Sequence, residues 1–164
     1  MEIVYATPLD AVFTKPIAAS RLGYLLEEKN IKVEPEFMVM EADGQKLISY
    51  DEREVPYDLL VSIPTHTGAD FVEASELGDE LHFIPTDKNT LMATEMQDVF
   101  VLGDATDLPS SKAGSVAHFQ SEVLAENLHH HIRGEALEPD FDGHANCFVE
   151  TGNGRAMLID FNYD

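Results

Sequence analysis

The stretch that decides the fold is Asp98-Val99-Phe100-Val101-Leu102-Gly103-Asp104-Ala105-Thr106. Its apolar residues predict a buried strand over residues 99–102, which ends at a glycine followed directly by a carboxylate. Glycine allows a ligand to approach the backbone closely, and the aspartate can accept a hydrogen bond from a sugar-like hydroxyl. A strand, a loop and a helix with a purely structural role remain the alternative, and this stretch alone leaves both open.

A helix start rich in small residues follows, Ser110-Ser111-Lys112-Ala113-Gly114-Ser115. The N-terminus of a helix offers free N–H groups and the positive end of the dipole to an electron-rich ligand. A lysine is unfavourable at that end, so its presence favours a role in binding over a solvated side chain. The candidate cofactor-binding residues are therefore Gly103, Asp104, Lys112, Ala113 and Gly114.

These residues also carry a resemblance. Residues 94–104 resemble the second FAD-binding motif of the two-dinucleotide-domain flavoproteins, the pyridine nucleotide–disulfide oxidoreductase superfamily. Residues 12–33, 58–68 and 143–160 extend the likeness, which is greatest to sulfide:quinone oxidoreductases and flavocytochrome c sulfide dehydrogenases. The resemblance implies an FAD-dependent oxidoreductase that takes sulfide as substrate and a quinone or another electron acceptor. It also implies that Asp104 binds the ribityl chain of FAD and that Pro64 belongs to a crossover loop touching the FAD.

The glycine-rich turns that hold the FAD pyrophosphate in this superfamily do not occur in the sequence. We therefore expect the chain to be the C-terminal part of a larger flavoprotein and to bind FAD weakly or not at all by itself. On this interpretation residues 1–85 are the remainder of the second dinucleotide-binding-like domain. Residues 86–134 return to the FAD domain as a strand and a long helix, and residues 135–164 begin a C-terminal β-hairpin domain.

Cys147 is the only cysteine, so no disulfide within the chain is possible. In the sulfide-oxidising relatives that the resemblance indicates, a cysteine in a similar position lies beside the flavin and takes part in sulfur transfer. Cys147 is accordingly the candidate catalytic residue, although this chemistry usually needs a second redox cysteine. The alternative is a small apolar cysteine buried in a core. We expect the isolated chain to be inactive.

The composition sets further limits. With 31 acidic and 10 basic residues the formal net charge is −21, which argues against nucleic acid as a partner because phosphate contacts need clustered Lys and Arg. No apolar run reaches the length of a membrane span. We expect a cytoplasmic chain, with a peripheral membrane position left open for the longer enzyme. No metal site is expected, because the run His129-His130-His131 spreads around a helix end and cannot converge on one ion.

Periodicity and turn signals predict an α/β fold, with incomplete Rossmann-like parallel sheet layers and a C-terminal antiparallel hairpin. Strands are expected over residues 3–6, 31–40, 46–50, 59–63, 99–102, 147–151 and 155–161, and helices over 15–29, 69–77 and 112–132. Because the unpaired edges of buried parallel strands are readily covered by a second copy, we expect a homodimer.

Two other functions stay open. The chain could belong to a flavoprotein resembling the type II NADH dehydrogenases, in which Cys147 would be structural. It could also be a non-catalytic module that associates with itself.

Overall fold

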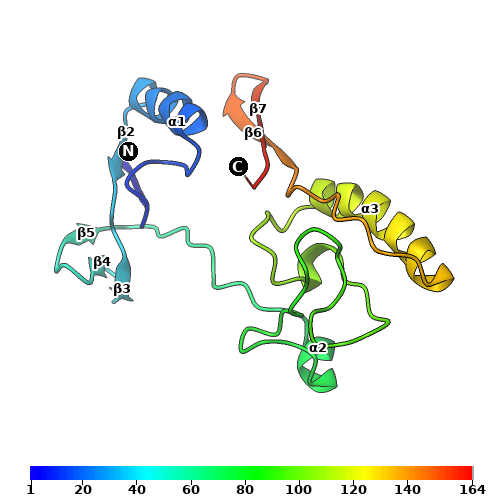
Figure 1. Ribbon diagram of the computed structural model, residues 1–164. Helices are drawn as coiled ribbons and strands as arrows, with labels where there is room; N and C mark the ends of the chain where they lie inside the picture. Colours follow the sequence, from blue (N-terminus) through cyan, green and yellow to red (C-terminus); the bar gives the residue numbers. More distant parts are fainter. Residues whose placement is uncertain (164) are drawn as a thin grey trace. The chain divides into compact units, whose positions relative to one another are not determined.

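The computed structural model of the protein describes residues 1–163, which form two compact units divided between Ile63 and Pro64. Figure 1 shows the elements of each. The division into three domains predicted above stays a prediction, since it concerns the place of the chain in a longer protein. No helix of residues 1–163 has both the length and the apolar character needed to cross a membrane.

The first unit begins with a parallel βαβ arrangement. Strand β1 (Ile3–Ala6) leads through helix α1 (Pro16–Glu28) to strand β2 (Ile31–Glu34), and Ile3 lies opposite Ile31 in a parallel pair. Proline suits the first turn of α1, because its fixed φ fits the helix and its missing N–H would have no partner there. All three elements were predicted, although β2 stops before Pro35, which cannot donate to a ladder.

A small antiparallel sheet completes the first unit. It contains β3 (Val39–Ala42), β4 (Lys46–Ser49) and β5 (Glu54–Pro56), with β4 in the centre. The β3–β4 turn is fixed by the Asp43 carboxylate, which accepts the backbone N–H groups of Gln45 at 2.9 Å and Lys46 at 2.8 Å. This Asx-type turn explains why the chain reverses its direction between β3 and β4.

The strand predicted over residues 59–63 is wrong. The segment belongs to no sheet, and its apolar side chains Leu59, Val61 and Ile63 are 81%, 86% and 81% exposed. A strand needs a neighbouring backbone to satisfy its N–H and C=O groups, and apolar composition does not supply one. Within the described part of the first unit no strand pairs with this segment.

The second unit holds a long helix and a hairpin. Its elements are α2 (Asp70–Ser75), the short 3₁₀ helix η1 (Gly103–Ala105), α3 (Gly114–Arg133), β6 (Ala145–Gly152) and β7 (Arg155–Phe161). Helix α3 ends at Gly134, whose φ of 71° suits glycine, as predicted. The predicted C-terminal hairpin is also confirmed, with β6 and β7 antiparallel.

The segment 99–102 is buried as predicted at Val101, but it is not a regular strand. It is held by single contacts instead: Val101 N–H donates to Leu91 O and Ala93 N–H donates to Val99 O, both at 2.9 Å. Leu91 and Asp98 have φ values of 66° and 64°, a left-handed conformation that interrupts a ladder. The α/β class predicted from the sequence is confirmed. The predicted layers of parallel sheet are reduced to one parallel sheet of two strands, β1 and β2, within residues 1–163.

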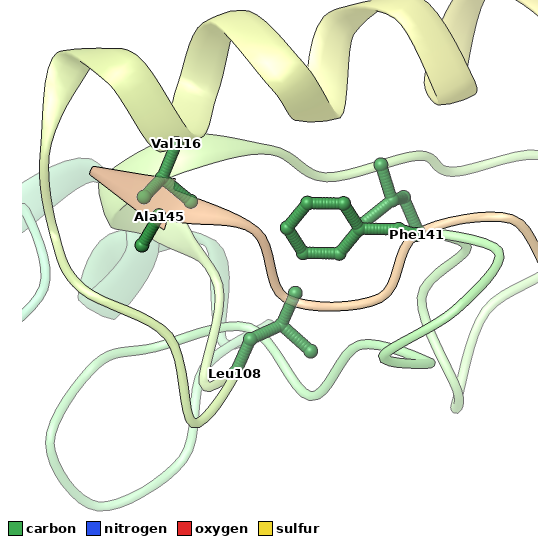
Figure 2. Packing of buried hydrophobic residues seen from close by; sticks show 5 residues of the cluster. Leu108, Val116, Phe141 and Ala145 are labelled. Carbon is green, nitrogen blue, oxygen red and sulfur yellow. The ribbon is translucent and has the colours of Figure 1, made fainter. Parts of the chain in front are cut away.

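One hydrophobic cluster holds the start of α3 against the start of the hairpin. It consists of the buried residues Leu91, Leu108, Val116, Phe141 and Ala145, and Figure 2 labels four of them, with Val116 on α3 and the others facing that helix. Val116 lies in the first turn of α3 and Ala145 is the first residue of β6. The cluster therefore fixes the N-terminus of α3 beside β6.

Candidate functional site

The turn after Leu102 favours glycine. Gly103 has a φ of +66°, and a Cβ built on it would lie 3.3 Å from the Cβ of Ala117 on α3. A left-handed conformation costs a residue with a side chain about 1–2 kcal/mol. The sequence therefore places glycine where the chain bends tightly against α3.

Hydrogen bonds fix both sides of this glycine. Its N–H donates to Oε1 of the fully buried Gln120 at 2.5 Å. Its carbonyl oxygen accepts the Thr106 hydroxyl at 2.9 Å and the Thr106 N–H at 3.3 Å. These bonds give the turn one defined orientation.

The next residue, Asp104, presents an exposed carboxylate. Within residues 1–163 this carboxylate makes no hydrogen bond to a protein group, although the backbone that carries it is fixed on both sides of Gly103. A carboxylate offers acceptor positions only, and its hydrogen bonds to hydroxyl groups are charge-assisted. The turn is thus suited to accept a hydroxyl from a bound ligand.

Lys112 is held close to the same turn. Its ammonium donates to the carbonyl oxygen of Thr106 and lies 4.8 Å from the centre of the Phe83 ring. Partial desolvation lowers the pKa of Lys112, and the negative charge of Asp104, Asp107 and Asp79 opposes this shift. The lysine is therefore a positioned cation and not a freely solvated one.

The start of α3 lies beside Cys147. No side chain caps this helix at Ala113. The Val116 N–H donates to Ala113 O at 3.0 Å, so the N–H groups of Gly114 and Ser115 are the ones left for a ligand. The Ser115 hydroxyl donates to the carbonyl oxygen of Asn146 at 2.8 Å, and Cys147 is the next residue. Cys147 is half-buried on β6 opposite Ile159. The structure thus brings the Ala113–Gly114 helix start and the cysteine to neighbouring positions.

Comparison with known proteins finds sulfide:quinone oxidoreductases among the relatives of this chain. The mitochondrial sulfide:quinone oxidoreductase of Schizosaccharomyces pombe is 33% identical over 110 residues, covering 67% of this chain and 24% of the relative. The mouse mitochondrial sulfide:quinone oxidoreductase is 25% identical over 169 residues, covering 98% of this chain and 38% of the relative. No family model matches the chain.

The chain is homologous to the sulfide:quinone oxidoreductases.

A solved structure shares the fold of this chain. The crystal structure of the sulfide:quinone oxidoreductase from Aquifex aeolicus superposes with a TM-score of 0.73 at 15% identity, over 97% of this chain and 45% of that one. The chain spans about a quarter to two-fifths of the length of the curated sulfide:quinone oxidoreductases from fission yeast and mouse.

The residues of the turn fit the FAD that sulfide:quinone oxidoreductase homology implies. Gly103 lacks the Cβ that would meet Ala117, and the Asp104 carboxylate accepts no hydrogen bond among residues 1–163, although its charge acts on Lys112. The Nε2 atom of Gln120, also buried at this turn, has no hydrogen-bond partner among residues 1–163. A tight turn, a free carboxylate and an uncapped helix start suit a sugar-like chain attached to an electron-rich ring.

Pro64 has no hydrogen bond to this group among the described residues. It is exposed at the boundary between the two units, and no hydrogen bond of the described residues connects its loop with Gly103 or Asp104. The loop is anchored at Gly68, whose N–H donates to Leu81 O at 2.7 Å. The role of Pro64 in cofactor binding stays a prediction.

The histidine run at the end of α3 is partly engaged in protein contacts. His131 Nε2 lies 2.5 Å from Asp98 Oδ1, and its ring meets Phe100 edge-on at 5.5 Å between centroids. This pair connects the end of α3 with the segment that leads to Gly103. It therefore has a structural explanation that needs no metal ion.

Sequence reasoning missed three residues of the turn: Gln120, Ala117 and Phe83. Gln120 lies on the same helix face as Val116 and Val123, so a polar residue within an apolar stripe was the available signal. Ala117 and Phe83 gave none, because a small helix residue and a loop phenylalanine are common in any fold.

Proposed function

We propose that this chain supplies the flavin-facing turn and one redox cysteine of a longer, sulfide:quinone oxidoreductase-like enzyme. The observation that carries the proposal is the fixed Gly103 turn, which presents an uncommitted Asp104 carboxylate beside the start of α3. Homology to the sulfide:quinone oxidoreductases supports the same assignment. The electron acceptor is proposed to be a quinone and the reductant sulfide.

Each residue has a proposed role. Asp104 accepts a hydrogen bond from a ribityl hydroxyl of FAD, and Gly103 keeps the backbone close to it. The N–H of Gly114, the first residue of α3, and the Lys112 ammonium stabilise negative charge on the ring edge, and Ala113 contributes its place at the helix start, because its own N–H donates to Ser111 O at 3.1 Å. FAD supplies two-electron redox chemistry when it is bound.

Cys147 is proposed to act as the sulfur carrier. Sulfide would attack a disulfide between Cys147 and a second cysteine from elsewhere in the longer enzyme, which breaks that S–S bond and leaves one cysteine as a persulfide and the other as a thiolate. The released thiolate would then pass two electrons to the flavin when FAD is bound. The position of Cys147 next to the Ser115–Asn146 hydrogen bond supports this role, because it ties the sulfur-bearing strand to the helix start.

The test is anaerobic reduction of the flavin in the longer enzyme. Sulfide should bleach the oxidised flavin absorbance, whereas NADH at the same concentration should not. Rapid bleaching by NADH together with inertness to sulfide would replace this proposal with a function resembling the type II NADH dehydrogenases.

The cytoplasmic location predicted from the sequence stays a prediction, while the matched relatives from yeast and mouse are named as mitochondrial.

The isolated chain should retain little FAD. A ribityl contact and a helix dipole each contribute about 1–2 kcal/mol, and the sequence contains no glycine-rich pyrophosphate turn. After incubation with FAD and desalting, the absorbance spectrum should therefore show far less than one flavin per chain. Stoichiometric yellow protein after desalting would contradict this expectation.

The first unit should promote a homodimer. Strand β1 pairs with β2 only, and the apolar side chains Leu59, Val61 and Ile63 are largely exposed. Exposed apolar segments and unpaired edges favour association with a second copy. The net charge of −21 opposes association at low salt but is screened beyond about 10 Å at 0.1 M salt.

Light scattering across a salt series measures this association. The dimer fraction should rise with salt and should fall when Val61 is replaced by Asp. A monomer at every salt and protein concentration would refute the prediction.

A further inference from the structure

Gln120 is a buried polar residue in which one side-chain polar atom has a hydrogen-bond partner and the other has none. Its side chain is fully buried on α3, and Oε1 accepts the Gly103 N–H at 2.5 Å. Its Nε2 has no hydrogen-bond partner among residues 1–163. Leaving a buried donor unpaired is unfavourable, and such groups in native proteins call for an explanation. The hydrogen bond to Gly103 is therefore the one polar interaction of the Gln120 side chain among residues 1–163.

The hydrogen bond that Gln120 makes to Gly103 affects the direction in which the Asp104 side chain points. Since Thr106 holds the carbonyl side of Gly103 and Gln120 holds the N–H side, the two peptide groups around Gly103 are both fixed. The direction in which Asp104 leaves the turn follows from these two groups. Without the glutamine oxygen the N–H side would be free to rotate, and the carboxylate would sample several directions.

We infer that Gln120 is a positioning residue, which orients the Asp104 carboxylate for its ligand through the Gly103 N–H. The inference rests on the proposed function, in which Asp104 binds a ribityl hydroxyl. A group held in its binding orientation before the ligand arrives loses less conformational freedom on binding, which raises affinity without a new contact. Gln120 itself needs no contact with the flavin.

Asn127 provides a matched control. It is also a buried amide on α3, but it bonds Thr90 O at 3.1 Å and Glu138 O at 2.8 Å, away from the turn. Gln120→Met and Asn127→Met both remove a buried amide from the same helix. Only the first should affect the turn, so a general loss of stability is separated from a loss of positioning.

The first readout is hydrogen exchange of the Gly103 amide in the ¹⁵N-labelled chain, which needs no flavin. Relative to the amide of Val101, exchange at Gly103 should accelerate about tenfold or more in Gln120→Met and remain unchanged in Asn127→Met. Gln120→Glu should restore protection, because a buried carboxyl group takes up a proton and still offers an acceptor oxygen. If Gln120→Met does not fold, protection in Gln120→Glu supports the inference and its loss overturns it.

The second readout is a double-mutant cycle on FAD affinity in the longer enzyme. Gln120→Met should weaken FAD binding about tenfold when Asp104 is present and much less when it is already Asn. Equal losses in both backgrounds, or unchanged exchange at Gly103, would overturn the inference. A failure of the proposed function is recognised separately, because Asp104→Asn alone would then leave FAD affinity unchanged.

Discussion

Replacing Cys147 with serine is expected to abolish sulfide-dependent flavin reduction in the longer enzyme, to below about 1% of the original rate. Serine is nearly isosteric with cysteine, so the half-buried position on β6 should be preserved. A hydroxyl cannot carry a sulfane sulfur or form a disulfide, and the path for electrons from sulfur is therefore interrupted. The bound flavin and the unfolding temperature should stay close to those of the unaltered enzyme.

Stopped-flow absorbance under anaerobic conditions measures this rate. Val149→Thr is a suitable control, because Val149 lies on the same strand, is also half-buried and carries no redox chemistry. Its rate should be close to normal. Sulfide reduction of Cys147→Ser at the unaltered rate would mean that the cysteine is structural.

The second large effect is expected at Asp104. Replacing it with Asn keeps the shape of the side chain but removes the charge from the proposed ribityl hydrogen bond. A charge-assisted hydrogen bond contributes about 1.5–3 kcal/mol, so FAD affinity should fall at least about tenfold. Fluorescence titration of the flavin-free longer enzyme with FAD measures the dissociation constant.

Asp98→Asn is the matched control for this variant. Asp98 is also an exposed aspartate of the same segment, but its carboxylate pairs with His131 at 2.5 Å. Asparagine tolerates its φ of 64°, so the backbone should not change. FAD affinity should stay within about twofold, since exposed ion pairs contribute little. Equal losses at Asp98 and Asp104 would contradict the assignment of the motif.

The helices and the hairpin were predictable because local rules determine them. Pro16 and Gly134 mark helix ends, and Gly152-Asn153-Gly154 marks the hairpin turn, each through a backbone preference that the sequence carries. The bounds of α3 differ from the expected 112–132 by a residue or two only. The conformation of these elements depends little on contacts with residues far away in the sequence.

The two wrong strands failed for the opposite reason. Residues 59–63 and 99–102 are apolar, but a strand is defined by the backbone that pairs with it, which no local pattern can reveal. At the site, Gly103 and Asp104 were recognisable as adjacent residues of one motif. Gln120 was not, because its bond to Gly103 joins residues far apart in the sequence.

The central claim is that the Gly103 turn and the start of α3 form a flavin-binding surface. The most direct test is an NMR titration of the ¹⁵N-labelled chain with FAD at concentrations up to the millimolar range, where weak binding is still visible. The account predicts saturable shifts at the amides of Gly103, Asp104 and Gly114, and none along β2. Saturable shifts confined to other parts of the chain would contradict it.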